Sequence, residues 1–299
     1  MSAARKPGAL RIQKLAVIGV GLIGGSFSLA LKKAKAVRRV VGVGRTQKNL
    51  KAAVRLGVID ETSGDPAEAV RDADLVLIAT PIGQMPDVLA QIAPALGEST
   101  VVTDAASTKQ NVIDDARRLL GRHFERFVPS HPIAGTENSG AAAAFAELYR
   151  QRNVIVVPQA ETKPSALRLV RSAWLACGAR IVSLDAREHD EIFAAVSHLP
   201  HVIAFSLVSM LAQRPDAPTL LGYSGGGLRD TVRIAGSSPE MWRDICIANR
   251  DALLGLLDGY ADELRLARDA IAAAKGAALM DIFERSRAAR SRWLLNKRG

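Results

Sequence analysis

The segment FVPSHPIAGTENSG, residues 127–140, holds a histidine in a stiff local sequence. A short apolar run ends at Pro129 and Ser130, His131 follows, and Pro132 restricts the backbone directly after it. A neutral imidazole in a fixed position can accept a proton from a hydroxyl while a hydride leaves the neighbouring carbon. The pattern predicts that His131 is a catalytic base, provided that a hydride acceptor and a substrate reach it.

Two further polar segments follow short β-branched runs that are typical of strands. Thr80 and Pro81 come after ADLVLIA, and DAASTK, residues 104–109, comes after TVVT. Ligands of a doubly wound sheet gather at the carboxyl ends of its strands, so both segments and His131 are expected at one edge. There Ser107 is expected to hold the imidazole or a substrate oxygen by a hydrogen bond.

The run LAVIGVGLIGGSFSLALKKA is typical of a turn that binds the phosphates of a dinucleotide. It places Gly19, Gly21 and Gly24 in GxGxxG spacing around Leu22 and Ile23, where a strand turns into a helix. The first glycine allows the tight turn, the second lets the backbone approach a pyrophosphate, and the third lets helix and strand pack closely. We therefore expect a dinucleotide cofactor here.

The end of the second predicted strand, RVVGVGRTQKN, bears on the choice of cofactor. NAD sites usually place an acid there for the ribose 2′-hydroxyl, but this chain has Gly44, followed by Arg45 and Thr46. A guanidinium and a hydroxyl suit a 2′-phosphate, so NADP is favoured over NAD. The alternative is that Arg45 stacks on the adenine or points into water. Thr80 and Pro81 are also assigned to the cofactor site.

The segment SHLPH, residues 197–201, interrupts an otherwise helical run. Pro200 is expected to kink or break that helix and to turn neighbouring side chains away from its regular face. His198 and His201 lie three residues apart, but no third ligand with suitable spacing accompanies them, so we expect no metal.

A second polar stretch, GGGLRDTVRIAGSSPEMWRDI, contains two arginines. Arg229 and Arg233 lie four residues apart, which places them on one face of a helix where they can bind carboxylates. Ser238 and Pro239 are typical of the cap and first turn of the next helix. The alternative is a solvated arginine pair with Asp230 as its local partner.

The elements that must position these residues change character near residue 185. From Leu15 to Asp185, β-branched runs alternate with helical stretches, which predicts an α/β Rossmann-type doubly wound parallel sheet. Beyond it the chain reads as long helices, too apolar for a single exposed stripe, which suggests burial in a bundle or against a second subunit. We predict a dinucleotide-binding domain over residues 1–185 and a helical substrate and dimerisation domain over 186–299.

Composition narrows the function classes. The 299 residues carry a net charge of +10, but much of it lies at the two ends and aromatic residues make up only 4%, so no stacking surface for nucleic acid is expected. A basic surface suits small anions better.

The cysteine content and the absence of targeting signals bear on the location of the protein. Two cysteines give neither a metal spacing nor a disulfide framework, and no signal peptide or uninterrupted membrane span is apparent, so we expect a cytoplasmic protein. The basic opening MSAARKPGALR is left as an arm without a role.

Taken in order, the motifs VIGVGLIGGS, GVID, ATPI, DAASTK, SHPIAGTE, SHLPH and RDTVRIAGSSPEMWRDI resemble those of the prephenate and arogenate dehydrogenases of tyrosine biosynthesis, also called cyclohexadienyl dehydrogenases. The resemblance extends over about residues 15–260. It implies an oxidoreductase with an NAD(P)-binding domain and a helical domain that intertwines in a homodimer. It also implies oxidative decarboxylation of prephenate to 4-hydroxyphenylpyruvate, with arogenate or both compounds as the alternative substrates.

The resemblance further implies residue roles. His131 becomes the base that removes the proton of the ring hydroxyl, and Ser107 positions that hydroxyl and the imidazole. Arg233 binds a substrate carboxylate, with help from His201 and His198. The chain leaves no room for a regulatory domain, so any inhibition by tyrosine is expected to compete with prephenate.

Two rival interpretations stay open. One is a different two-domain dehydrogenase acting on a hydroxy acid; such enzymes commonly use a lysine base, whereas the helix after residue 185 offers histidines. The other is a dimer that senses NAD(P) without turnover, in which His131 would be dispensable.

Overall fold

The computed structural model describes residues 10–136 and 138–296. Most of the N-terminal arm and Glu137, the last residue of the SHPIAGTE motif, therefore lie outside the described residues. Two compact units divide the chain after Asn249. The first contains the sheets and helices α1 to α11, and the second contains α12 and α13. The domain boundary near residue 185 stays a prediction.

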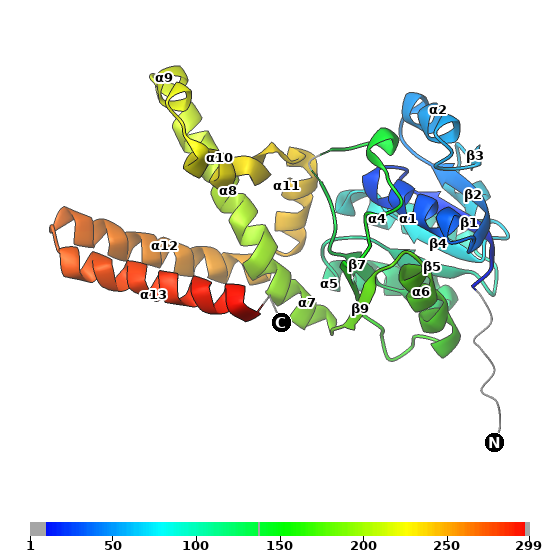
Figure 1. Cartoon of the computed structure of the whole chain (residues 1–299). Coiled ribbons are helices and arrows are strands. Elements are labelled where there is room, and N and C mark those ends of the chain that lie inside the picture. The colour runs from blue at the N-terminus through cyan, green and yellow to red at the C-terminus, as the bar shows by residue number, and fades with distance from the viewer. Residues whose placement is uncertain (1–9, 137, 297–299) are drawn as a thin grey trace. The chain divides into compact units, whose positions relative to one another are not determined.

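The first unit contains a six-stranded parallel sheet with helices packed on it (Figure 1). Its strand order is β3-β2-β1-β4-β5-β6, the order of a dinucleotide-binding Rossmann domain, with the reversal beside β1. The strands are β1 (Ile12–Ile18), β2 (Val37–Val43), β3 (Glu61–Thr62), β4 (Leu75–Ile78), β5 (Val101–Asp104) and β6 (Phe127–Val128). The predicted doubly wound sheet is confirmed.

Helices cover both faces of this sheet because its strands are apolar on both sides. Leu15 and Val17 of β1 pack with α1, α2 and α6, whereas Ala16 and Ile18 pack with α3, α4 and α5. The helices are α1 (Leu22–Lys33), α2 (Gln47–Arg55), α3 (Pro66–Val70), α4 (Met85–Ile92), α5 (Gln110–Leu120) and α6 (Pro164–Ala176).

A second sheet of three strands differs from the expected continuation of the first. It contains β7 (Ser130–Pro132), β8 (Asn153–Val156) and β9 (Arg180–Ser183) in the order β7-β8-β9. The run RFVPS divides at Pro129 into β6 and β7, and β7 pairs antiparallel with β8. Apolar strands of the two sheets have similar sequences, so only the observed hydrogen-bonded pairing of strands shows to which sheet each one belongs.

The helical part of the first unit begins with α7 (Ala186–Phe193), a π-helical turn (Ala194–His198) and α8 (Leu199–Ala212). These three form one continuous helix, so Pro200 does not break it; the π turn directly before Pro200 absorbs the disturbance instead. This helix is long and apolar enough to span a membrane by length and composition alone. It nevertheless buries His189, Asp190 and His198, which join the site described below.

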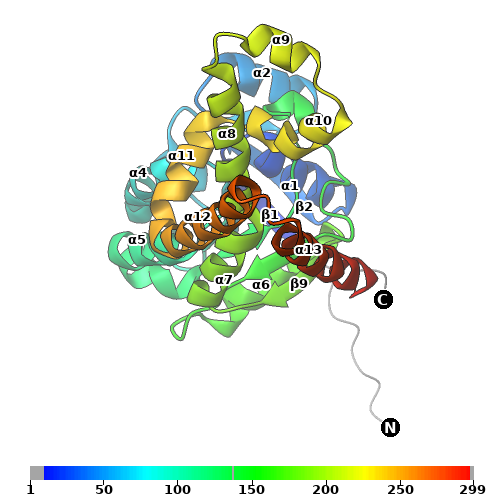
Figure 2. The same ribbon diagram turned by 90° about the vertical axis from the view of Figure 1, so that its left-hand side faces the viewer.

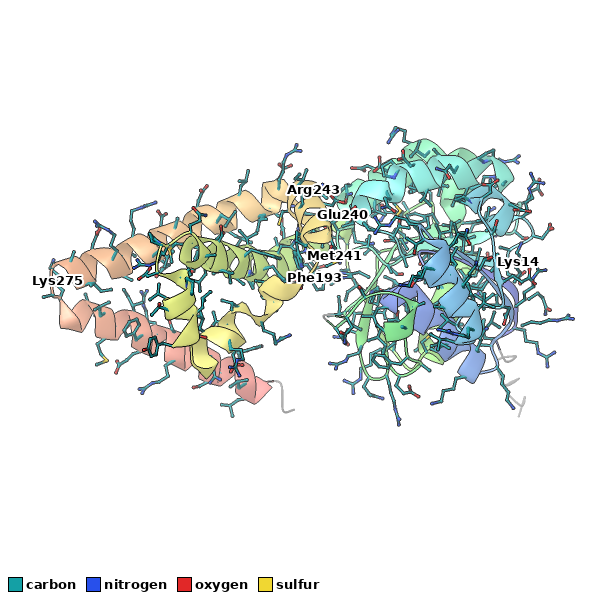
Figure 3. All side chains as sticks on the ribbon, turned by 90° about the horizontal axis from the view of Figure 1, so that it is seen from above. Lys14, Phe193, Glu240, Met241, Arg243 and Lys275 are labelled. Carbon is teal, nitrogen blue, oxygen red and sulfur yellow. The ribbon has the colours of Figure 1, made fainter. Side chains whose placement is uncertain are left out.

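The remaining helices of this unit are α9 (Ala217–Gly222), α10 (Gly226–Val232) and α11 (Pro239–Ala248), with a 3₁₀ turn η6 (Arg233–Gly236) after α10. Both α10 and η6 lie beside α8 (Figure 2). The predicted start of α11 is confirmed, since the Ser238 side chain accepts the Met241 amide and Pro239 is the first helical residue. Glu240, Met241 and Arg243 are exposed on α11 (Figure 3).

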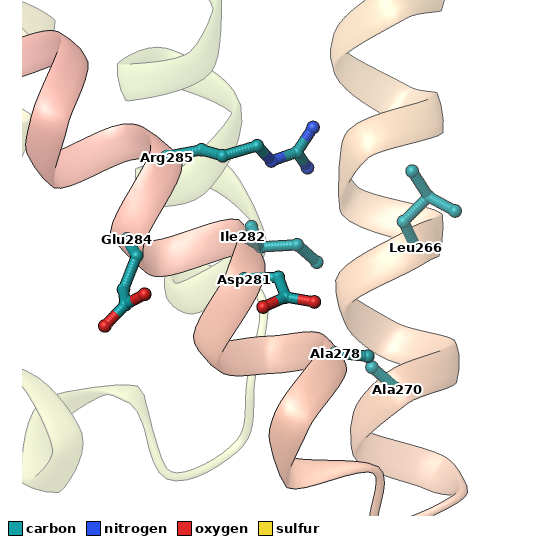
Figure 4. A pocket seen from close by; sticks show the side chains of 7 residues that line it. All are labelled: Leu266, Ala270, Ala278, Asp281, Ile282, Glu284 and Arg285. Atoms are coloured by element: carbon teal, nitrogen blue, oxygen red, sulfur yellow. The ribbon is translucent and has the colours of Figure 1, made fainter.

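The second unit is a helical hairpin of α12 (Arg250–Ala272) and α13 (Gly276–Asn296), with Lys275 in the turn between them (Figure 3). A cavity of about 620 Å³ lies between the two helices, and Leu266, Ile282 and Arg285 are among its lining residues (Figure 4). Large apolar side chains are exposed on both helices, among them Leu264, Ile271, Met280, Phe283 and Leu295.

Candidate active site

The glycine turn has the geometry expected for a phosphate-binding loop. Gly19 has φ +102°, and a Cβ there would lie 2.4 Å from the Ala79 carbonyl oxygen. A Cβ at Gly24 would lie 2.3 Å from the Gly19 carbonyl oxygen, because α1 packs directly on β1. By contrast, a Cβ at Gly21 would meet nothing within 4 Å. The backbone therefore has open space at Gly21, where a pyrophosphate would approach the start of α1.

The neighbouring strand end adds a polar group to the same edge. β4 pairs directly with β1, so Thr80 and Pro81 follow β4 beside the glycine turn. The Thr80 hydroxyl oxygen is buried and has no hydrogen-bond partner within the described chain. A buried hydroxyl without a partner is costly, and a bound cofactor would supply one. Leu22 and Ile23 form the first turn of α1, and the Ile23 carbonyl accepts from the Tyr149 hydroxyl at 2.6 Å.

The end of β2 presents an exposed guanidinium. Arg45 lies 3.5 Å from a carboxylate oxygen of Glu240, a residue of α11 that sequence patterns did not single out. Thr46 precedes α2 as its N-cap, but its side chain makes no capping hydrogen bond. Arg45 and Thr46 are thus available to a 2′-phosphate, and Glu240 competes for Arg45.

His131 is buried within β7 rather than in a loop after a strand. Both backbone polar groups of Ser130, the residue before His131, are hydrogen-bonded. The Ser130 amide donates to Asp104 at 3.0 Å, and the Ser130 carbonyl accepts from the Lys109 ammonium at 2.8 Å. Asp104 and Lys109 also form a fully buried ion pair. This pair fixes the backbone that carries His131, which explains a lysine in DAASTK.

The imidazole of His131 contacts two side chains of α7. His131 Nδ1 lies 2.8 Å from His189 Nε2, and the Phe193 ring packs against it at 4.7 Å between centroids. The pKa of His131 is well below its usual value, first because of burial and then because of the charges of His189, Lys109 and His198. His131 is therefore neutral near pH 7, as a general base must be.

Ser107 lies in the loop between β5 and α5, two residues before Lys109, and is half-buried. It follows the strand next to β6, which leads into β7. Ser107 thus belongs to the edge of the sheet that carries His131, and its contact with the imidazole or substrate stays a prediction.

Two of the other predicted substrate residues, His198 and His201, pack against Trp242 of α11. His201 stacks on the Trp242 ring, with centroids 3.5 Å and planes 19° apart, and the His198 ring meets its edge at 6.0 Å. Burial and the charge of Arg233 lower the pKa of His201, against a hydrogen bond to Ser197 that raises it. Arg233 is exposed and begins η6, which follows α10 without a gap, so the helical face that it is expected to share with Arg229 stays a prediction.

The structure thus brings His131 into contact with His189, and His198 and His201 into contact with Trp242. The charge of His198 acts on the pKa of His131, and that of Arg233 on the pKa of His201. His189, Asp190 and Trp242 also belong to this region, although no motif singled them out. The available signal was an acid and a histidine on the otherwise apolar face of α7. Among residues 10–136 and 138–296, no cluster of three or more His, Cys, Asp or Glu side chains could hold a metal ion.

Family models match most of the chain. Residues 27–183 match the prephenate dehydrogenase nucleotide-binding domain, and residues 185–285 match the prephenate dehydrogenase dimerization domain. The first match begins at residue 27, after the glycine turn. The cofactor role of that turn is therefore supported by its geometry and not by the family model.

Individual relatives agree with these matches. The cyclohexadienyl dehydrogenase of Zymomonas mobilis subsp. mobilis is 38% identical over 92% of this chain and 94% of its own. The prephenate dehydrogenase of Bacillus subtilis is 36% identical over 82% of this chain and 67% of its own.

Two solved structures have the same fold over nearly the whole chain. Prephenate dehydrogenase from Aquifex aeolicus, in complex with hydroxyphenyl propionate and NAD+, superposes with a TM-score of 0.87 at 32% identity over 95% of this chain and 99% of its own. Arogenate dehydrogenase from Synechocystis superposes with a TM-score of 0.76 at 27% identity over 94% of this chain and all of its own. The chain belongs to the prephenate dehydrogenase family of oxidoreductases.

Proposed function

We propose that this protein is a prephenate dehydrogenase that converts prephenate into 4-hydroxyphenylpyruvate and carbon dioxide while reducing NAD(P)+. The observation that carries the proposal is His131, a buried imidazole with a lowered pKa at the sheet edge that also holds the glycine turn. Family membership supplies the reaction class.

We assign parts of this reaction to two of the described residues. His131 takes the proton of the ring hydroxyl, and Ser107 holds that hydroxyl against the imidazole. A nicotinamide bound at the glycine turn would supply the acceptor for the hydride that leaves the carbon bearing the hydroxyl. Loss of the ring carboxylate as carbon dioxide sends its electron pair through the ring to the oxygen on that carbon, and the ring becomes aromatic. The phenolate oxygen then takes back the proton held by His131, which gives 4-hydroxyphenylpyruvate. A fixed base is needed because the proton and hydride leave neighbouring atoms.

Arg233 is proposed to bind a carboxylate of the substrate, with His201 and His198 beside it. The guanidinium is exposed, and its charge reaches His201, so an anion bound there would also meet that imidazole. The Trp242 ring holds His201 by stacking, and the His201 Nδ1–H donates to the Ser197 carbonyl at 2.8 Å. This leaves His201 Nε2 free to face the substrate.

The cofactor fits the residues present. Open space at Gly21 and the unpartnered Thr80 hydroxyl accommodate a dinucleotide at the start of α1. We propose NADP in preference to NAD, because Gly44 replaces the usual ribose-binding acid and Arg45 is exposed next to it. Glu240 weakens this preference by sharing the guanidinium.

Prephenate is proposed as a substrate, with arogenate as an alternative or second substrate. The two differ in a keto or amino group on the side chain. Relatives carry names of both kinds, including cyclohexadienyl dehydrogenase and arogenate dehydrogenase.

We also propose a homodimer in the cytoplasm, without nucleic acid or a membrane as partner. Support for the dimer comes from the match to a dimerization domain and from the exposed apolar side chains of α12 and α13. Light scattering coupled to gel filtration should give twice the chain mass of 31.8 kDa. A monomer at micromolar concentration would contradict this assembly.

The deciding experiment crosses prephenate or arogenate with NAD or NADP and follows nicotinamide reduction at 340 nm. Stoichiometric 4-hydroxyphenylpyruvate from prephenate establishes the reaction, and the four rates rank substrates and cofactors. If none of the four combinations of substrate and cofactor gives nicotinamide reduction, although the protein is a folded dimer that binds NAD(P), the proposal is overturned. A nucleotide sensor or an enzyme for another acid substrate would then be favoured.

A further inference from the structure

A chain of two short hydrogen bonds leads from His131 to a buried carboxylate. His131 Nδ1 lies 2.8 Å from His189 Nε2, and His189 Nδ1 lies 2.8 Å from Asp190 Oδ1. His131 comes from β7, whereas His189 and Asp190 come from α7, more than fifty residues later. His189 is completely buried and Asp190 is 6% exposed, so water does not compete for these contacts.

Asp190 is held as an ionised acceptor. Its Oδ1 also accepts from the Lys109 amide at 2.8 Å, and its Oδ2 accepts from the Gln110 amide at 2.9 Å, at the start of α5. Burial raises the pKa of Asp190, but the bonds from His189, Gln110 and Lys109 outweigh it and lower that pKa overall. The carboxylate therefore has no proton to donate at neutral pH.

The proton positions follow from this acceptor. His189 Nδ1 must carry the hydrogen that Asp190 accepts, so in the neutral ring His189 Nε2 is the acceptor. His131 Nδ1 must then carry the hydrogen of the next bond, and His131 Nε2 keeps its lone pair. One carboxylate thereby fixes the tautomers of both rings.

We propose that His189 and Asp190 are positioning residues that hold His131 in the Nδ1–H tautomer, with Nε2 as the base that takes the substrate proton. This assignment rests on the proposed dehydrogenase function. His131 donates through Nδ1 both before and after Nε2 is protonated, so neither ring has to move during the reaction. The negative charge of Asp190 stabilises the imidazolium that forms.

Other charged groups also face these rings. Lys109 lowers the pKa of His131 and of His189, while Asp104 and Asp190 raise that of His189. The charge of His198, in the π turn, also lowers the pKa of His131. The Lys109 charge is balanced by its ion pair with Asp104. Asp190 is therefore the carboxylate that accepts the hydrogen bond from His189.

A purely structural role is the alternative to be tested. The Asp190 carboxylate ties α7 to α5 through the backbone amides of Lys109 and Gln110, so its substitution alone would destabilise the fold without any effect on the base. The tests must therefore separate stability from the tautomer and from turnover.

The first test reads the tautomer without turnover. The chain has five histidines, so ¹⁵N labelling of histidine gives few imidazole signals, and the His131→Gln variant assigns those of His131. We expect His131 to be protonated on Nδ1 with a bare Nε2 near pH 7. In Asp190→Asn, the amide can donate to His189 and reverse both rings. A wild-type His131 protonated on Nε2 overturns the proposal even if the enzyme is active.

The second test measures turnover in two variants of His189. His189→Leu removes the acceptor for His131 Nδ1–H, whereas the side-chain oxygen of His189→Gln can still accept it. We expect His189→Leu to lower kcat roughly 100-fold with little change in KM for prephenate, and His189→Gln to recover roughly 10-fold of that loss. His123→Leu, a buried histidine paired with Arg122 in η3, is the matched control and should keep its kcat.

The outcomes distinguish the two hypotheses. Equal losses of kcat in His189→Leu and His189→Gln, matched by equal losses of Tm, would mean a structural role. A kcat in His189→Leu close to that of the wild type would also overturn the positioning role. If the wild-type protein turns over neither prephenate nor arogenate, the proposed function fails, while the tautomer measurement still decides whether Asp190 fixes His131.

Discussion

The Gly24 backbone lies against the carbonyl oxygen of Gly19, so that a Cβ on Gly24 would stand 2.3 Å from that oxygen. Gly21, three residues earlier, has nothing within 4 Å of the same added atom. The two glycines therefore differ in what they do: Gly24 permits α1 to pack on β1, and Gly21 leaves space for a ligand.

Alanine at these two positions should separate stability from cofactor binding. Gly24→Ala should lower the free energy of unfolding by about 1–3 kcal/mol, because backbone must shift to admit the methyl group. Gly21→Ala should unfold with the wild-type Tm but raise the dissociation constant for NAD(P) by roughly 10-fold or more. Calorimetry and fluorescence titration give the two values. Unchanged cofactor affinity in Gly21→Ala would remove this turn from the cofactor site.

Replacement of His131 should stop the chemistry and spare cofactor binding. His131→Ala should lower kcat by about 10²–10⁴-fold, because the ring hydroxyl loses its base, while the affinity for NAD(P) stays unchanged. Steady-state kinetics and cofactor titration test both statements. His123→Ala serves as a control for loss of a buried imidazole elsewhere. A near-normal rate in His131→Ala would falsify the role given to this residue.

Arg233 should contribute mainly to substrate affinity. Arg233→Ala should raise KM for prephenate by roughly 10–100-fold, as expected for loss of a charge-assisted hydrogen bond to a carboxylate. Arg214→Ala, which removes an exposed arginine paired locally with Asp216, should leave KM unchanged. Initial rates over a range of prephenate concentrations make the comparison. Equal KM values for the two variants would place Arg233 outside the substrate site.

Arg45 and Glu240 should shift cofactor choice in opposite directions. Arg45→Ala should reduce kcat/KM for NADP relative to NAD by roughly 10-fold, because it removes the guanidinium available to a 2′-phosphate. Glu240→Gln should increase the same ratio, since Arg45 loses its competing carboxylate. Arg39→Ala, from the exposed pair with Glu61, is the matched control. A ratio that none of these changes alters would disprove the 2′-phosphate contact.

The five histidines should make the protein less stable in mild acid. Their pKa values all lie below the usual value, with burial as the leading cause, and that of His198 falls to about 4. The unfolded chain therefore binds more protons than the native protein below about pH 6.5, where free histidine titrates. The stability present above that pH is lost as the pH falls toward 4.

Urea unfolding between pH 7.5 and 5 measures this loss. Each histidine contributes up to about 1.4 kcal/mol per pH unit in this window, which lies above the range where most carboxylates titrate. His198→Gln should make the free energy of unfolding depend less steeply on pH, by the contribution of one bound proton. A free energy of unfolding that does not change from pH 7 to 5 would contradict the lowered pKa values.

Parts of the fold were predictable because their signals are local. The strand-to-helix turn at Gly19, the alternation of strands and helices, and the cap at Ser238 each depend on residues a few positions apart. The division of the later strands into a second sheet was not predictable in this way. It depends on β7 pairing with β8, some twenty residues later, and the apolar run NVIV suits either sheet.

The same distinction applies to the candidate site. Residue types and spacing were enough to single out His131, Ser107 and Arg233 as residues able to do this chemistry, and the family motifs indicated the reaction class. Only the tertiary structure placed His189 and Asp190 behind His131, stacked Trp242 on His201 and brought Glu240 to Arg45. The physical reason is that hydrogen bonds and ring contacts depend on distances of a few ångströms between elements far apart in the chain, and residue spacing does not encode those distances.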